Sequence, residues 1–574
     1  MARGFGLGGF VVLGALLVAG CAGAPAHEPG AALAPNAATL KAEPPGASTA
    51  ELDELYLDQD DGDDPPAGAG QMTEEAARAK HLFDGGRWEQ ASLLLKRVSD
   101  GETGDDETNR ELAQYRIAIA LFNLKYLQMS YAIFSDIAAK SKHVKHSESL
   151  LWLARLALLM PEPADVVERV GKYSQEELAR FGTAAQRELF AHLNTLFGRY
   201  KVRVRDYELA ATVLAQVDAK SKFYVRAQLA LGAAEHGQRK PARAAAAFER
   251  AAAAIGSGAL SAEDARMRNL ARLLRGSALY AAALSTDSAG VVKVDAKLLA
   301  TAVRAWQQVD PDSEYWLDAA LETASAQIVA GDYANAASTL RWLSAAGAPT
   351  TADFDVDTLS AAVAFRTCRY GEADAAAAKI ASKYDPVLNA LDALLARPAL
   401  VGDDAERGFF ELASQLRAGG ATVAASIRPL LDEAASDRMF LSELDYLRVL
   451  AAEETRFKQS PASFRSSMLG ADVADVLALS QEIVVRDAGR IALDRVLRSR
   501  DALSAKGSPL LTAITTATKP NGDKQAAQTQ IAIILSQPRA RYLLATPELN
   551  GKGRKPAGPK TAPAETAVAS KCAP

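Results

Sequence analysis

Apolar and polar residues alternate with helical spacing from about residue 72 to residue 545. Short helical stretches come in pairs before residue 400, and longer ones follow at 441–457 and 473–503. In the longest stretch the apolar positions 473, 477, 484, 488 and 491 form one stripe, which we interpret as packing core rather than a partner-helix surface. The pattern predicts an all-α protein.

A duplicated segment shows how the short helices are organised. Residues 216–227 read QVDAKSKFYVRA, and residues 308–319, 92 positions later, read QVDPDSEYWLDA. On either side, Ala210 and Ala244 lie 34 positions apart, as do Ala302 and Ala336. This period is typical of stacked helix–turn–helix units, which form a solenoid. The longer step of 58 positions between Ala244 and Ala302 indicates an insertion, which we place at 285–292.

The residues at these spacings resemble the tetratricopeptide repeat. The first match is Leu231-Gly232, followed by Ala244, Phe248 and Ala251; the others are Gly331, Tyr333, Ala336 and Leu340, and Gly86, Trp88 and Ala91. The resemblance covers residues 71–399 and implies an α-solenoid with a concave binding face. Small residues let the helices approach closely, and the turn glycine permits a positive φ. Residues 400–545 lose the repeat and predict a separate helical C-terminal domain.

Residues 1–21 carry a targeting signal. Arg3 precedes an apolar stretch, residues 7–19, that is too short to span a membrane. Val18-Ala19-Gly20-Cys21 resembles the lipobox of bacterial lipoproteins, which implies removal of residues 1–20 and lipid attachment at Cys21. Ala22, rather than Asp, favours the outer membrane, with the protein on its periplasmic face. An ordinary secretory signal that contains a cysteine is the alternative.

Two terminal segments lack the composition of a folded core. Residues 21–70 are rich in Ala, Pro, Gly and acidic residues and predict a disordered tether, within which 52–57 form a short amphipathic patch. Residues 546–574 predict a disordered basic tail. Besides Cys21 the chain has only Cys368 and Cys572, which are either one disulfide or two free thiols.

No motif indicates an enzyme, a cofactor or a metal. His143 and His146 are close enough to share a site, but two imidazoles without a third ligand do not make one. Phosphate loops, nucleophile elbows and zinc-protease motifs are missing from the sequence. The 65 basic and 70 acidic residues give a net charge of −5, which argues against a nucleic-acid partner. The sequence therefore predicts a binding protein and not an enzyme.

The resemblance also implies which residues face a partner. Repeat proteins that clamp a terminal carboxylate carry Lys and Asn at two inner positions, and the units at 229, 321 and 358 lack them. By the same correspondence six residues line the concave face: Arg226, Leu229, His236, Asp318, Leu321 and Ile328. We expect a lipid-anchored scaffold for protein partners of a cell-envelope machine, anchored to the membrane through its N-terminus. An envelope enzyme or its regulatory subunit, a structural spacer, and homo-oligomerisation through the C-terminal helices stay open.

Overall fold

The described part of the chain is almost entirely helical. The structure, a computed structural model, describes residues 69–536 except 162–164, 185, 257, 259, 287–291, 345–349 and 505–507. Its regular structure consists of helices α2 to α25, two 3₁₀ turns, and one antiparallel hairpin of β1 (Leu284–Thr286) and β2 (Val292–Val294). The predicted all-α, solenoid-like fold is confirmed. The predicted signal peptide with Cys21, the tether and the basic tail lie outside the described residues.

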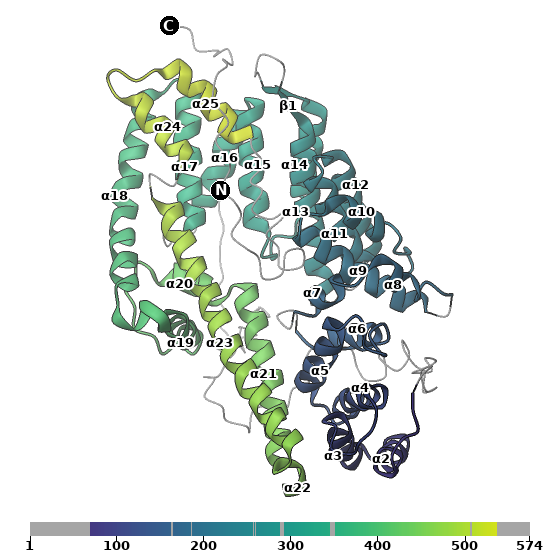
Figure 1. Ribbon diagram of the computed structural model, residues 1–574. Coiled ribbons are helices and arrows are strands. Elements are labelled where there is room, and N and C mark those ends of the chain that lie inside the picture. The colour runs from purple at the N-terminus through teal and green to yellow at the C-terminus, as the bar shows by residue number, and fades with distance from the viewer. Residues whose placement is uncertain are drawn as a thin grey trace, which may run out of the picture.

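Antiparallel helix pairs follow one another along an arc from α2 to α18 (Figure 1). The regular pairs are α2 (Glu74–Asp84) with α3 (Trp88–Ser99), α4 (Glu107–Asn123) with α5 (Leu127–Ala139), α9 (Arg187–Arg203) with α10 (Tyr207–Leu214), α11 (Tyr224–Gly237) with α12 (Pro241–Ile255), α13 (Ala262–Ala283) with α14 (Ala296–Trp306), α15 (Trp316–Ala330) with α16 (Tyr333–Leu343), and α17 (Thr351–Arg366) with α18 (Tyr370–Leu395). Between the second and third pairs lie α6 (Ser149–Leu159), α7 (Val166–Gly171) and α8 (Gln175–Ala179).

The turn inside these pairs has one recurrent geometry. The residue two positions before the start of the second helix has a positive φ. The residue after it donates its backbone N–H to the carbonyl of the residue five positions earlier. Examples are Lys240 to Glu235 at 2.9 Å and Asp332 to Gln327 at 2.8 Å. This left-handed cap satisfies the carbonyls at the end of the first helix. Six turns have this geometry, and glycine is the positive-φ residue in only two of them. The positive-φ residues are Gly86, Lys125, Arg205, Arg239, Gly331 and Cys368. The non-glycine turns accept a local strain of about 1 kcal/mol each.

Glycines allow the two helices of a pair to touch. A Cβ on Gly198 would lie 2.4 Å from Leu214, and one on Gly232 would lie 2.4 Å from Phe248; in both cases the partner is 16 positions further along the chain. Gly276 and Trp306 meet in the same way at 2.3 Å, but 30 positions apart. The extra residues fall in the α13–α14 turn, where the β1–β2 hairpin replaces the left-handed cap. The predicted insertion is therefore a hairpin on an otherwise regular pair.

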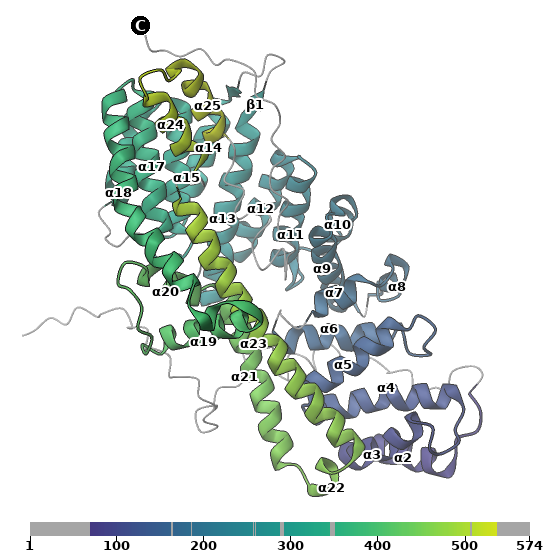
Figure 2. The ribbon, with the colours of Figure 1, turned by 60° about the vertical axis from the view of Figure 1, so that its left-hand side comes forward.

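The last helices return along the arc. They are α19 (Ala405–Arg417), α20 (Arg428–Ala435), α21 (Arg438–Gln459), α22 (Ala462–Arg465), α23 (Met468–Leu503), α24 (Pro509–Thr518) and α25 (Lys524–Ser536). Helix α23 contacts α17, α18 and α19 at one end and α3 and α5 at the other. Figures 1 and 2 show this helix running beside α21 from the late pairs to the first ones. The α21–α23 hairpin therefore joins the two ends of the arc.

Two hydrophobic cores hold the molecule together, and the C-terminal helices contribute to both. Val473, Leu477 and Val484 of α23 belong to the core of the early pairs. Ala488 and Val496 of the same helix belong to the core of the late pairs. The apolar stripe of α23 is thus packing core, as its pattern predicted.

Helix α18 contains a proline. A proline ordinarily ends or kinks a helix, but α18 continues through Pro386 to Leu395. Tyr384, Val387 and Leu391, on both sides of the proline, are buried in the late core. This burial outweighs the hydrogen bond that proline removes from the helix.

Among the described helices, none combines the length and the apolar character needed to cross a bilayer. Cys368, at the exposed turn between α17 and α18, is disulfide-bonded. Both other cysteines lie outside the described residues.

Candidate functional site

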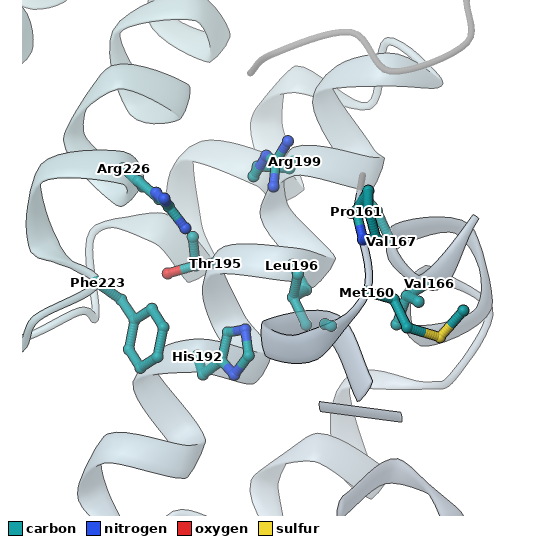
Figure 3. Close-up of a pocket in the computed structure, with 11 residues that line it drawn as sticks. Met160, Pro161, Val166, Val167, His192, Thr195, Leu196, Arg199, Phe223 and Arg226 are labelled. Carbon is teal, nitrogen blue, oxygen red and sulfur yellow. The ribbon is translucent and has the colours of Figure 1, made fainter. Parts of the chain in front are cut away.

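A small cavity opens between α9 and α11, at the middle of the arc (Figure 3). Its volume is about 40 Å³. Thr195 and Arg199 of α9 and Arg226 of α11 form its polar side, while the segment from α6 to α7 and Phe223 supply apolar walls. We call this site the arginine pocket. A cavity of this size accepts a small polar group rather than a whole side chain with its backbone.

The repeat spacing places the polar residues on one face. Arg205 and Arg239 hold the left-handed position in consecutive turns, 34 positions apart. The same offset carries Thr195 onto Leu229 and Arg199 onto Ala233. These are the two inner positions that carry Lys and Asn in repeat proteins with a carboxylate clamp. Helix α9 therefore presents a hydroxyl and a guanidinium where its neighbour presents two apolar groups.

His192 lines the pocket and stays uncharged. Its ring is 4% exposed and stacks on Phe223 with centroids 4.2 Å apart. Burial, together with the charges of Arg226, Lys222 and Arg199, lowers the pKa of His192 to about 3. Arg226, Lys222 and Arg199 therefore all lie near enough to this buried imidazole to disfavour its charged form.

At the rim of the pocket, three arginines lie near the carboxylate of Glu263. Glu263, at the start of α13, lies 2.8 Å from Arg266, 3.5 Å from Arg438 and 4.0 Å from Arg226. The hydrogen bond from Arg266 is the main reason that the pKa of Glu263 is lowered. The Arg226 side chain is 54% exposed. Solvent therefore reaches this guanidinium beside the pocket.

The six residues expected to face a partner divide into two groups. Leu229, Leu321 and Ile328 are at most 3% exposed and belong to the hydrophobic cores. Arg226 is exposed at the arginine pocket, and Asp318 is half-buried on α15. His236, at the end of α11, is also half-buried, and burial lowers its pKa. Of the six, only Arg226 lines the pocket.

A second polar site joins the C-terminal helices to the early pairs. Both carboxylate oxygens of Glu453 on α21 accept from the backbone N–H of Gln128, at 3.0 and 3.1 Å, in the first turn of α5. The Gln128 side chain donates to Ser480 on α23 at 2.8 Å and accepts from the Tyr446 hydroxyl. Burial raises the pKa of Glu453 to about 8. This carboxyl group caps α5 from 325 residues away and serves the fold.

The histidine pair does not build a metal site. His146 lies 3.0 Å from Glu177, and the Nδ1 of His143 accepts from the backbone N–H of Lys145 at 3.0 Å. Burial lowers the pKa of His143. Across the described residues, no group of three or more His, Cys, Asp or Glu side chains has a metal-binding arrangement.

Sequence reasoning missed Thr195 and Arg199. The clamp positions that the resemblance identifies are those of the units at 229, 321 and 358, which leave out the unit of α9. The basic residues that follow Arg199 (Lys201, Arg203 and Arg205) are typical of a solvated helix or turn face and do not by themselves indicate a site. Extending the repeat offset back from Leu229 and Ala233 would have identified both residues.

The sequence of this chain was compared with protein-family models and with the curated proteins. No protein-family model matches it, and none of the curated proteins matches its sequence. The arrangement of the side chains is therefore the basis for the function proposed below.

Proposed function

We propose that the protein is a lipid-anchored scaffold of the cell envelope that binds a segment of a partner protein at the arginine pocket and the surrounding face of α9 and α11. The observation that carries the proposal is the pocket itself, where Arg199 and Arg226 from two consecutive units converge beside an apolar wall. Guanidinium groups bind carboxylates with two parallel hydrogen bonds, so the site suits an acidic residue.

The apolar wall adds a second requirement for the partner. Phe223 and Val167 line the same cavity as the arginines. A segment that places an acidic side chain beside an aliphatic or aromatic one would satisfy both parts of the pocket. Because the helices that carry these residues are packed into the early core, the site is preformed and loses little entropy on binding.

The lipid on Cys21 would supply the remaining part of the function. Attachment at Cys21 would hold the pocket near the membrane and raise the local concentration of envelope partners. Binding by the helical pairs needs no catalytic group, which fits the lack of an enzyme motif in the sequence.

Crosslinking in intact cells tests the proposal. A photoreactive residue at Lys222, beside the pocket, is expected to capture an envelope protein in the wild-type background. Reversing both charges (Arg199→Glu with Arg226→Glu) should reduce that product at least tenfold, because a carboxylate ligand would then be repelled.

The control reverses two charges on the same α9–α10 region outside the pocket, Lys201→Glu with Arg205→Glu. This variant should keep the product. Equal loss in both variants, or no loss in either, would contradict the pocket as the binding site. Separately, Cys21→Ser should release the protein from the membrane fraction; continued membrane attachment would contradict the lipid anchor.

A further inference from the structure

The chain itself contains a segment with the chemistry that the arginine pocket requires. Residues 51–64 read ELDELYLDQDDGDD, with eight acidic residues, no basic ones, and Leu52, Leu55, Tyr56 and Leu57 among the acids. The segment lies outside the described residues. Acidic and apolar side chains alternate in its first half, so one turn or extended stretch presents both kinds together.

The arginine pocket complements this segment in charge and in polarity. Arg199 and Arg226 line it, Lys222 acts on the same buried ring, and Arg438 adds positive charge at the rim. Met160, Val167 and other apolar residues line the same cavity. A carboxylate in the cavity would be paired with two guanidiniums, and its apolar neighbour would cover the wall.

The segment is also within reach. The described chain starts beside α2 and α4, where the backbone N–H of Gly70 donates to Asp106 at 2.6 Å. The stretch from Tyr56 to Gly70 spans up to about 48 Å when extended. From α2 the pocket on α9 is three steps away along the first helices α2, α4, α6 and α9, at about 10 Å per step. The tether is long enough to enter the pocket of its own chain.

We propose that the acidic segment of residues 51–64 binds in the arginine pocket of the same chain and competes there with the partner. This inference rests on the proposed function only in treating the pocket as a binding site. Because the segment and the pocket belong to one chain and only about 15 residues separate Tyr56 from Gly70, an effective concentration on the order of millimolar is expected, so even a weak contact would be substantially occupied. A partner must then displace the segment, and binding is reserved for partners with higher affinity or local concentration.

The test uses the full chain with a photoreactive residue in place of Tyr56. Illumination of the purified protein at low concentration should give a crosslink within one chain, and peptide mapping should place it on 157–167 or 192–226. The yield should fall at least fivefold in Arg199→Gln with Arg226→Gln. The matched control, Lys201→Gln with Arg205→Gln, should keep it.

A second variant distinguishes loss of the contact from loss of the fold. Asp53→Asn with Glu54→Gln changes only the segment and should lower the crosslink yield by a similar factor while the thermal unfolding curve stays unchanged. It should also raise partner capture from Lys222. Crosslinks that map elsewhere, that form only between chains, or that survive both pairs of substitutions would overturn the inference. If partner capture still depends on Arg199 and Arg226 in that case, the proposed function stands without it.

Discussion

The inner faces of the middle and late helix pairs follow the same plan but end differently. On α13 and α17 the chain covers its own face: the Tyr280 hydroxyl donates to the carbonyl of Leu535 at 2.6 Å, and the Gln528 side chain donates to the carbonyl of Phe365 at 2.8 Å. On α9 and α11 the corresponding face carries the arginine pocket. Where the C-terminal helices pack, inner residues such as Leu321 are core; on α9 the two inner positions hold Thr195 and Arg199, which line the pocket. In the proposed function, the same position of the repeat would serve stability in one region and recognition in the other.

The largest effect on stability should come from a substitution in α25, one of the C-terminal helices that pack on the late pairs. Ile531 on α25 is 0% exposed, and its replacement by Ala removes buried methyl groups and leaves a cavity. We expect Ile531→Ala to lower the free energy of unfolding by about 2–5 kcal/mol, measured by denaturant or thermal unfolding. The neighbouring Gln530 is exposed on the same helix, so Gln530→Ala should stay within about 0.5 kcal/mol. Similar values for the two variants would show that α25 does not stabilise the late pairs.

The contact between α21 and α5 should make stability depend on pH. Because the pKa of Glu453 is raised to about 8, the folded protein holds this proton more tightly than the unfolded chain does. The resulting stability is fully present below pH 4.5 and is lost as the pH rises through 8. We expect Glu453→Gln, which keeps an oxygen acceptor for Gln128, to match the wild type at pH 5 and to exceed its unfolding free energy by roughly 2–4 kcal/mol at pH 9.

The adjacent residue provides the control for this pH dependence. A hydrogen bond from Lys458 is the main cause that lowers the pKa of Glu454, so its small contribution has the opposite sign and is lost as the pH falls. Because this pair is exposed, Glu454→Gln should change stability by less than about 1 kcal/mol at any pH. A parallel loss of the pH dependence in both variants would contradict the role assigned to Glu453.

A larger side chain between α9 and α10 tests whether their close packing holds the helix that carries the arginine pocket. Gly198→Ala puts a methyl group 2.4 Å from Leu214 and should lower the unfolding free energy by about 1–3 kcal/mol. Gly371→Ala, in the first turn of α18 with no atom within 4 Å of the new Cβ, should be neutral or stabilise by up to about 1 kcal/mol. Thermal unfolding of both variants measures the difference, and equal melting temperatures would contradict the close packing at Gly198.

The smallest effect on stability should come from the pocket itself. The Arg226 side chain is 54% exposed, and ion pairs at the surface contribute little to stability, so Arg199→Gln with Arg226→Gln should cost less than about 1 kcal/mol. The same variant should lose partner capture. A loss of several kcal/mol in thermal unfolding would instead make the arginines structural and remove the contrast between the two faces.

Sequence patterns predicted the fold better than the site, for a physical reason. Helical periodicity and the repeat spacing are local and recur many times, so the pairs and the hairpin insertion could be located from the sequence alone. The contact between Gln128 and Glu453 joins residues 325 positions apart and leaves no periodic signal. The same holds for Arg438, which reaches the rim from α21. Thr195 and Arg199 are different, since the repeat spacing does encode them once it is extended to α9.

The α21–α23 hairpin changes how the molecule responds to force. An open solenoid behaves as a spring, because each unit touches only its neighbours and small rotations add up along the array. Here the two ends are tied: Tyr126 stacks on Phe464 with centroids 5.6 Å apart, and Lys96 pairs with Asp472 at 3.0 Å. A load applied between the first pair and the late pairs must first break these contacts. The arc therefore stays stiff up to a threshold and becomes extensible only beyond it.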